Sequence, residues 1–440
     1  MPIQQSASNL KVDVVTMGCS KNLMDSERLL AGLVNAGITV RHNPDVVDCD
    51  TVIINTCGFI GDAKEESIDM ILSMVQAKNE RRVGKLYVMG CLSERYMEDL
   101  RAELPEVDRW YGKFDWHGIV SSLTGRDSSS VVKPWDRVLT THPHSAYLKI
   151  SEGCNRRCAF CAIPLITGTH KSRPMADILM EVNQLVSRGV KEFNVIAQDL
   201  SSYGMDISHR SQLAELISRM SDIQGVEWVR LHYAYPSNFP MELLDVIAER
   251  DNVCKYLDMA LQHISDKVLN NMRRNITGSE TKALIEEIRR RVPDIHLRTT
   301  LMVGFPGEGE KEFEELMDFV KTTRFERMGA FAYSEEENTI AAKTLTDEIP
   351  QPEKEKRLET IMKIQEDVSE ELQKSKVGTI FKVIIDEEEG DYFVGRTQWD
   401  SPEVDPEVLI EKESDLQVGE FYNVAITDFT AFELYGKVIR

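Results

Sequence analysis

The stretch that decides the fold is Glu152–Pro164, which reads EGCNRRCAFCAIP. It places Cys154, Cys158 and Cys161 in a Cys-x3-Cys-x2-Cys pattern, directly after an apolar run that predicts a strand. Three thiols this close together can converge on one metal centre, and Cys thiolates are the ligands that hold iron–sulfur clusters. A four-iron cluster with only three Cys ligands leaves one iron open for another ligand.

The alternatives are a structural zinc site and a chance grouping of cysteines. Structural zinc usually takes four ligands, often as two closely spaced Cys pairs or as Cys and His pairs. No fourth Cys or His lies close by in this pattern. Ligand counting therefore favours a cluster over zinc.

Length and composition indicate a globular protein of several domains. The chain has 440 residues, of which 42% are hydrophobic, enough for about two to four domains. No run of 18 or more apolar residues occurs, and Met1–Asn9 is polar and lacks the pattern of a secretory signal. We therefore expect a cytoplasmic protein, in which grouped cysteines indicate metal binding or catalysis rather than disulfides.

Residues 10–124 alternate apolar runs with helical patterns, which predicts a parallel α/β domain. Three of the predicted strands end next to a cysteine and a glycine. These are residues 12–18 with Cys19 and Gly18, residues 51–56 with Cys57 and Gly58, and residues 86–90 with Cys91 and Gly90.

Ligands collect outside the carboxyl ends of parallel strands, so we expect these three cysteines to share one edge of the sheet. The glycines allow tight turns and close approach of the backbone. We interpret Cys19, Cys57 and Cys91 as ligands of a second four-iron cluster, again with an open iron. The alternative is three buried cysteines that act as small hydrophobic residues. Cys49 and Cys254 lack this placement and are predicted to be core or surface thiols.

Residues 140–372 form the next predicted domain, and its first strand follows a segment of poor pattern, Gly125–Ser145, that we interpret as a linker. Six strand patterns alternate here with helical patterns, which predicts an incomplete TIM-like barrel of six βα units. Chemistry in such barrels lies at the C-terminal ends of the strands, and the three grouped cysteines follow the first strand. The predicted strands are residues 146–150, 192–197, 228–232, 256–260, 296–303 and 329–333.

Four other strand ends carry residues that could line a site. Gly304–Glu308 could equally be only a turn, and Gln262-His263 could be a satisfied polar pair at a helix start. Because all four stretches lie at the ends of predicted strands, where the chemistry of such barrels is found, we treat them as candidate site residues. The four stretches are Gln198-Asp199, Tyr233–Ser237, Gln262-His263 and Gly304–Glu308.

The C-terminal part changes in character. Residues 346–374 predict a helix packed on the barrel, and residues 375–440 predict a small antiparallel β-barrel. The latter hold 15 Asp and Glu against 6 Lys and Arg, and the whole chain carries a net charge of −21. This balance opposes RNA binding. The acidic turns 386–391 and 400–407 could bind a basic protein or could be solvated loops.

Over essentially its whole length the chain resembles the methylthiotransferases of the radical SAM superfamily, in which SAM is S-adenosylmethionine. Their architecture is an N-terminal domain with three cysteines, a radical SAM barrel and a C-terminal TRAM domain. The resemblance is closest to the RimO-type branch, which acts on protein twelve of the small ribosomal subunit. The tRNA-modifying branch usually shows Gln-Met-Asn after the first Cys, whereas Cys19 is followed here by Ser-Lys-Asn. The matching motifs are GCSKN (18–22), DSE (25–27), NTCGFI (55–60), GCL (90–92), residues 152–164, QD (198–199), YG (203–204) and VGFPGE (303–308).

One departure is Thr167 before Gly168, where these families often carry Arg; it puts a local contact in doubt. The resemblance implies SAM and two 4Fe–4S clusters as cofactors, with Phe160 near the adenine of SAM and Gln198 and Gly304 as further contacts. It implies that SAM is cleaved at one cluster to a 5′-deoxyadenosyl radical, while the auxiliary cluster presents the sulfur. The implied ligands are Cys154, Cys158 and Cys161 for the former and Cys19, Cys57 and Cys91 for the latter, with no catalytic residue beyond them.

The implied reaction adds a methylthio group to the β-carbon of an aspartate in that ribosomal protein, in two SAM-dependent steps. We expect this basic protein and an electron donor as partners, with the ribosome as a further candidate, and neither a membrane nor tRNA. Two alternatives stay open. The first is methylthiotransfer to a tRNA adenosine, which would need a basic C-terminal barrel. The second is a non-catalytic iron–sulfur scaffold or electron carrier, which usually saturates its irons with four Cys.

Overall fold

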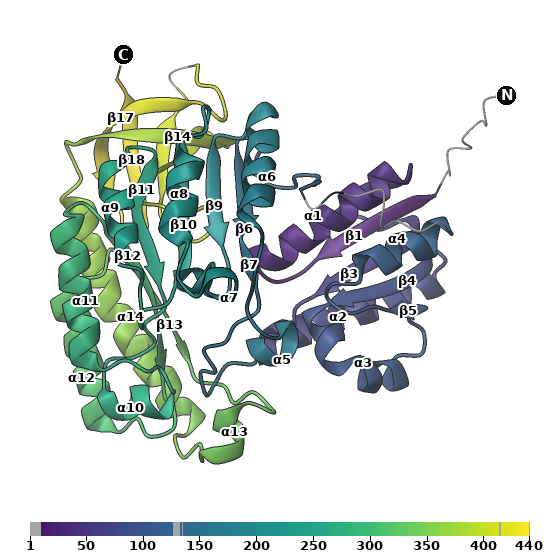
Figure 1. Cartoon of the computed structure of the whole chain (residues 1–440), viewed down its shortest axis with the longest axis horizontal. Helices are drawn as coiled ribbons and strands as arrows, with labels where there is room; N and C mark the ends of the chain where they lie inside the picture. Colours follow the sequence, from purple (N-terminus) through teal and green to yellow (C-terminus); the bar gives the residue numbers. More distant parts are fainter. Residues whose placement is uncertain (1–9, 126–132, 134, 413–414, 440) are drawn as a thin grey trace. The chain divides into compact units, whose positions relative to one another are not determined.

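The computed structural model describes residues 10–125, 133, 135–412 and 415–439. The prediction for Met1–Asn9 and most of the first half of the predicted linker lie outside these residues. The chain divides into two compact units (Figure 1). None of the helices in the described ranges combines the length and apolar character needed to cross a membrane. The first unit comprises the described part of Met1–Thr141 with Ala162–Thr169 and Ala176–Glu181, and the second comprises His142–Cys161, His170–Met175 and the described part of Val182–Arg440.

The first unit is built on a five-stranded parallel sheet in the order β2-β1-β3-β4-β5. The three predicted strands are present and lie side by side as β1, β3 and β4, each with a nearly continuous buried run, as expected for parallel strands covered on both faces. The sheet consists of β1 (Lys11–Thr16), β2 (Thr39–His42), β3 (Cys49–Thr56), β4 (Val83–Gly90) and β5 (Arg109–Trp110), and its helices are α1 (Ser20–Asn35), α2 (Gly61–Asn79), α3 (Cys91–Glu103) and α4 (Trp116–Thr124).

The described part of the predicted linker is not a free connection. Gly125 ends α4 in the left-handed conformation, and residues 135–144 have no regular structure. Nevertheless the Arg137 guanidinium is buried between Glu27 and Glu181, with 2.7 Å from its Nη1 to Glu181 Oε1. A buried cation held by two carboxylates fixes this segment within the first unit.

The second unit contains a six-stranded, all-parallel sheet in the order β13-β12-β11-β10-β9-β6. All six predicted strands are present. Helix α14 packs against β13 and α12, as predicted for residues 346–374. The strands are β6 (Ser145–Lys149), β9 (Glu192–Ile196), β10 (Trp228–Ala234), β11 (Val253–Met259), β12 (His296–Val303) and β13 (Arg327–Ala332). The longer helices are α8 (Leu213–Ser221), α9 (Glu242–Glu249), α11 (Gly278–Arg291), α12 (Glu310–Thr323) and α14 (Gln351–Lys374), while helix α6 (Met175–Ser187) is divided between the two units.

Short elements connect these strands and helices. The loop that carries the three grouped cysteines lies between the small hairpin strand β7 and helix α5, and β7 pairs antiparallel with β8. The short elements are β7 (Ser151–Glu152), α5 (Ile163–Thr167), β8 (Lys171–Ser172), the 3-10 turn η1 (Leu200–Ser202), α7 (Met205–Ser208), α10 (Asp266–Asn271) and α13 (Ile340–Thr344).

The C-terminal segment closes into a five-stranded barrel, β14-β15-β16-β18-β17, as predicted. It is not wholly antiparallel, because β16 pairs parallel with β18. Strand β16 was not predicted, and the predicted turn 386–391 is in large part the end of β14. The strands are β14 (Ile380–Glu389), β15 (Tyr392–Thr397), β16 (Glu407–Glu411), β17 (Phe421–Phe429) and β18 (Glu433–Val438), around a core that includes Val383, Ile385, Val408, Val424 and Leu434.

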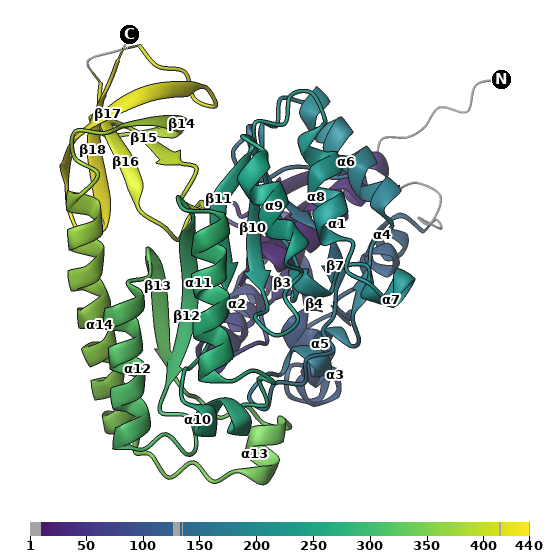
Figure 2. The same ribbon diagram turned by 60° about the vertical axis from the view of Figure 1, so that its left-hand side comes forward.

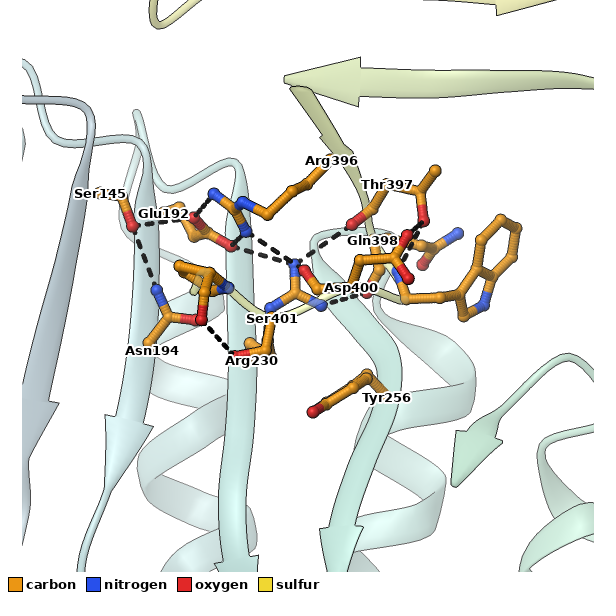
Figure 3. Close-up of polar contacts among 12 residues, drawn as sticks. Ser145, Glu192, Asn194, Arg230, Tyr256, Arg396, Thr397, Gln398, Asp400 and Ser401 are labelled. Atoms are coloured by element: carbon orange, nitrogen blue, oxygen red, sulfur yellow. Dashed lines mark hydrogen bonds and ion pairs between the residues drawn. The ribbon is translucent and has the colours of Figure 1, made fainter. Parts of the chain in front are cut away.

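The small barrel lies by the beginnings of the parallel strands (Figure 2). A buried ionic network joins the two (Figure 3). The Glu192 carboxylate at the start of β9 accepts hydrogen bonds from Arg396 of β15 (2.7 Å) and from Arg230 of β10 (3.0 Å). Ser145 Oγ donates to the same carboxylate at 2.8 Å. All three charged side chains are almost fully buried. The network therefore holds the small barrel at the end of the sheet where the strands begin, opposite to their carboxyl ends.

Three acids of the predicted acidic turns belong to this junction. Asp386 pairs with Arg396 at 2.6 Å and lies 2.9 Å from His144 Nε2, while Asp400 pairs with Arg327. Asp405 pairs with Arg298 of β12 in the same way. Both interpretations of these turns, as a surface that binds a basic protein and as solvated loops, are wrong for these three residues, because this chain's own basic side chains neutralise them.

We predict that Glu192→Gln destabilises the second unit by about 3–5 kcal/mol, because it leaves two buried guanidinium groups short of their counter-charge. The matched control is Glu227→Gln, which removes an exposed pair between Glu227 and Lys382 of β14 (3.1 Å) and should cost about 1 kcal/mol or less. Urea unfolding of the full chain measures both variants. Equal losses in the two variants would contradict the role given to Glu192.

The contribution of Glu192 should depend on pH. Burial by itself raises the pKa of this carboxyl, but the charges of Arg396 and Arg230 outweigh burial and hold it well below its usual range. A lowered pKa in the folded state stabilises fully above the pKa of a free Glu, about 4.3, and less as pH falls through the folded pKa. The difference in unfolding free energy between the wild type and Glu192→Gln should therefore be constant from pH 7 to 5. It should shrink below about pH 4.

Candidate functional site

The three N-terminal cysteines lie where the sequence predicted, at the carboxyl ends of adjacent strands. Cys19 is the N-cap of α1 after β1, Cys57 follows β3, and Cys91 is the first residue of α3 after β4. Gly18 has a φ of +85°, and a Cβ at this position would come within 2.9 Å of Cys57 Sγ. Only glycine allows this close approach between the two cysteine-bearing turns.

Asn22, on the first turn of α1, connects all three strand ends. Its amide nitrogen donates to the carbonyl of Met17 at 3.1 Å and to that of Thr56 at 2.9 Å. Its Oδ1 accepts from Cys91 Sγ at 3.3 Å. Asn22 is fully buried, so its contacts fix the spacing of the cysteine-bearing segments.

Lys113 is a buried cation beside these cysteines. Its Nζ donates to Asn22 Oδ1 and to Asp25 Oδ2, both at 2.9 Å, and only 2% of the residue is exposed. The pKa of Cys19 is lowered. Desolvation of the thiol by neighbouring protein atoms acts to raise this pKa, but the charges of Lys21 and Lys113 and hydrogen bonds from two backbone N–H groups outweigh the desolvation. This pocket therefore favours a thiolate at Cys19.

The other two thiols of this set have raised pKa values. Burial raises the pKa of Cys57, and burial raises that of Cys91 to about 11. The neighbouring thiols Cys19 and Cys57 contribute to the rise at Cys91, which reflects the mutual repulsion of thiolates held close together. Bound metal would relieve that repulsion, since it deprotonates a coordinating thiol. The donor set thus fits an iron–sulfur cluster held by three thiolates.

The second set of thiols lies on the loop between β7 and α5. The Arg156 N–H lies 3.5 Å from Cys154 Sγ, and the Cys161 N–H donates to the Cys158 carbonyl at 3.1 Å. Burial raises the pKa of Cys154 to about 11. Within the described ranges no three His, Cys, Asp or Glu side chains surround a point where a single metal ion would bind. A four-iron cluster presents a separate iron to each thiolate, so its ligands need not meet at one point.

Gln198 and Asp199 follow β9, as predicted, and each contacts the cysteine loop or the hairpin before it. Gln198 Nε2 donates to Glu152, while Gln198 Oε1 is buried with no partner among the described residues. Asp199 pairs with Arg156 of the cysteine loop at 2.7 Å. Gln198 thus presents an acceptor that a ligand could use.

Gln262-His263 and Gly304–Glu308 meet in a buried network. His263 Nδ1 accepts from the Ser265 N–H, so its Nε2 donates to Glu308 Oε2 at 3.1 Å. Glu308 also accepts from the Gly304 N–H at 3.0 Å and from Arg357 of α14 at 2.7 Å. His263 is therefore a satisfied structural histidine, the alternative that the sequence left open.

Phe160 and Gly304 come close to one another through Phe305. The Phe160 and Phe305 rings form an edge-to-face pair with centroids 6.2 Å apart, in a cluster that includes Met302 and Tyr333. Gly304 has a φ of +74°, and a Cβ there would lie 2.4 Å from Cγ of Lys354. The glycine is thus required by the packing of α14, whatever else it contacts. Cys49 and Cys254 are buried core thiols, as expected.

Sequence reasoning missed Lys113, Tyr235 and Arg274. Lys113 lies 22 positions after Cys91 in a stretch without a motif, and its role depends on a contact with Asp25 across the sheet edge. Tyr235 was included only within the strand-end stretch Tyr233–Ser237. Both Tyr235 and Arg274 contact Cys158, at 3.5 and 3.4 Å from its Sγ.

Three family models match the chain, and together they cover most of it. Residues 11–112 match the Uncharacterized protein family UPF0004, residues 148–320 match the Radical SAM superfamily, and residues 377–439 match the TRAM domain.

Among solved structures, the radical SAM methyltransferase TsrM from Kitasatospora setae, bound to tryptophan and a SAM analogue, matches with a TM-score of 0.54 and 16% identity over 73% of each chain. The cobalamin-dependent SAM radical enzyme OxsB, with aqua-cobalamin and SAM bound, matches with a TM-score of 0.52 and 12% identity over 81% of this chain and 56% of its own. At these identities the likeness concerns the fold.

Curated relatives match over nearly the full length. The ribosomal protein uS12 methylthiotransferase RimO of Parabacteroides distasonis is 59% identical, over 98% of this chain and 99% of its own. The protein of the same name from Bacteroides fragilis is 58% identical over 97% and 99%, and that from Cytophaga hutchinsonii is 48% identical over 98% of both. The chain therefore belongs to the RimO family of ribosomal protein uS12 methylthiotransferases, within the radical SAM superfamily.

Proposed function

We propose that this chain transfers a methylthio group to the β-carbon of an aspartate in ribosomal protein uS12, with SAM and two 4Fe–4S clusters as cofactors. The observation that carries the proposal is the presence of two separate sets of three thiols at the carboxyl ends of parallel strands. The 59% identity to a curated uS12 methylthiotransferase, over nearly the full length of both chains, supports uS12 as the substrate.

In this proposal Cys154, Cys158 and Cys161 hold the cluster that binds SAM, while Cys19, Cys57 and Cys91 hold the auxiliary cluster. When bound, these groups supply one-electron chemistry on SAM and the sulfur that is transferred. The polypeptide supplies position: Asn22 and Lys113 fix the first set of loops, and the Arg156–Asp199 pair fixes the second. An aspartate C–H offers no proton at ordinary pKa, so no acid–base residues are needed.

For SAM we propose contacts from Phe160, Gln198 and Gly304. Gln198 supports this best, because its buried Oε1 lacks a partner among the described residues, and a buried acceptor of this kind is costly unless a ligand satisfies it. Phe160 offers a partly buried ring beside the loop that contains Gly304.

In this proposal the N-terminal domain with the auxiliary cluster comprises residues 10–124, the radical SAM barrel comprises residues 140–372, and the TRAM domain comprises residues 375–440.

The partners in this proposal are a basic ribosomal protein and an electron donor in the cytoplasm, with the ribosome as a further candidate. The remaining acids of β14 and its turn, Glu387, Glu388, Glu389 and Asp391, are exposed. They lie in a strongly acidic part of the chain, which supports a basic partner and opposes tRNA.

The direct test offers uS12 and tRNA separately to the anaerobically reconstituted full chain, with SAM and a chemical reductant. We expect mass spectrometry to find a methylthio group on one aspartate of uS12 and none on tRNA. A chain with Cys19, Cys57 and Cys91 all replaced by Ala should cleave SAM but transfer no methylthio group. Its iron content should fall from about eight to about four per chain, whereas Cys254→Ala should leave it unchanged. Modified tRNA with unmodified uS12 would overturn the substrate.

Lys113→Met should impair the auxiliary cluster, because Asp25 loses its buried counter-charge and Asn22 loses a donor. We expect destabilisation of the first unit by about 3–5 kcal/mol and a loss of up to about four irons per chain. Lys85→Met changes an exposed lysine on β4 and serves as the matched control.

The double variant Lys113→Met/Asp25→Asn removes the uncompensated carboxylate as well. It should recover part of the lost stability if charge imbalance causes the defect. Unchanged iron content and unfolding in Lys113→Met would contradict the role of this lysine.

A further inference from the structure

Two polar side chains lie against the sulfur of Cys158. Arg274 Nη1 lies 3.4 Å from Cys158 Sγ, and the Tyr235 hydroxyl lies 3.5 Å from it. Cys158 is also the buried member of the three, whereas Cys154 and Cys161 are partly exposed. A hydrogen bond or charge at Cys158 is therefore shielded from solvent and acts strongly.

Arg274 is a buried cation without a carboxylate partner. It is 3% exposed, and its other terminal nitrogen donates to the Ala260 carbonyl. Its Nε has no hydrogen-bond partner, and no Asp or Glu in the described part of the chain pairs with it. A buried charge is costly unless it is paired, so the folded chain leaves a positive charge beside Cys158 that calls for an anion.

Arg156 provides an internal comparison. Its guanidinium also lies over the Tyr235 ring, at 4.2 Å from the centroid, against 4.1 Å for Arg274. The charge of Arg156, however, is matched by Asp199 at 2.7 Å. Of the two arginines on this ring, Arg274 is the one whose charge remains to be balanced.

The backbone holds Arg274 rigidly against the cysteine loop. The Ala159 N–H, next to Cys158, donates to the Met272 carbonyl at 2.9 Å. The Tyr235 hydroxyl donates to the carbonyl of Arg274 itself at 2.9 Å, and the Arg274 N–H donates to Leu269 at 3.0 Å. The guanidinium is thus positioned before any cofactor binds.

We propose that Arg274 is a positioning residue whose charge and N–H donor act on the Cys158 thiolate and thereby raise the reduction potential of the cluster held by this loop. The inference rests on the proposed function, in which Cys154, Cys158 and Cys161 are the ligands. Reduction adds one negative charge to the cluster. A fixed cation and hydrogen bonds to the sulfurs favour the more negative state, and both are known to set cluster potentials.

The test is an anaerobic redox titration followed by electron paramagnetic resonance, with the titrant as the electron source. It uses the full chain with Cys19, Cys57 and Cys91 replaced by Ala, so that only the second cluster contributes. In this parent, Arg274→Gln should lower the equilibrium constant for reduction at least tenfold, a shift of about 59 mV for one electron. Arg273→Gln, an exposed neighbour on the same turn, is the matched control and should leave the potential unchanged.

Arg274→Lys keeps the charge but loses the planar guanidinium, so it should shift the reduction potential by less than Arg274→Gln. If Arg274→Gln assembles no cluster, the comparison uses Arg274→Lys instead. If the equilibrium constant for reduction in both Arg274 variants stayed within threefold of the parent's value, this inference would be overturned, while the proposed function would stand. An equal shift in Arg273→Gln would overturn it too, since the effect would then belong to the turn. A parent that assembles no four-iron cluster would instead overturn the ligand assignment.

Discussion

Sulfur atoms from distant parts of a chain can hold one metal centre only if the backbone brings them within a few ångströms of each other. Adjacent parallel strands bring them together in this way. Their carboxyl ends share one edge, and each connection leaves that edge through a new turn. In the first unit, Cys19, Cys57 and Cys91 come from three adjacent strands in this way. The glycine at position 18 is the local condition, because any side chain there would collide with Cys57.

Buried charges follow a consistent rule in both units. Lys113 faces Asp25, and Glu192 faces two arginines, so most charges that leave water find a partner within the chain. Such pairs add little net stability over apolar residues, but breaking one is costly, and they fix orientation. Arg274 departs from the rule beside a candidate cluster ligand. A departure at this position has a physical explanation if the missing anion is supplied by a cofactor.

The sequence predicted the parallel strands well. Those of the first unit contain apolar runs that end beside Gly and Cys, and those of the second unit alternate with helical patterns. It missed β2, β5 and β16, which are short and only partly buried, so they leave no comparable run. It also missed Lys113 and Arg274. Their contacts join residues 88 and 116 positions apart, and no spacing in the sequence marks such a contact.

The acidic C-terminal segment shows why net charge must be counted on the folded surface. Asp386, Asp400 and Asp405 contribute to the acidic composition, yet each faces an arginine and adds little to the external field. The arginine partners of Asp400 and Asp405 lie on β13 and β12, and Asp386 contacts His144 just before β6. The same acids that suggested a protein partner therefore attach the small barrel to the sheet. Only the exposed acids, such as those of 387–389, can attract a basic partner, and screening confines their reach to about 8–10 Å in physiological salt. The exposed acids of β14 lie on the small barrel, at the opposite end of the strands from the cysteine loop.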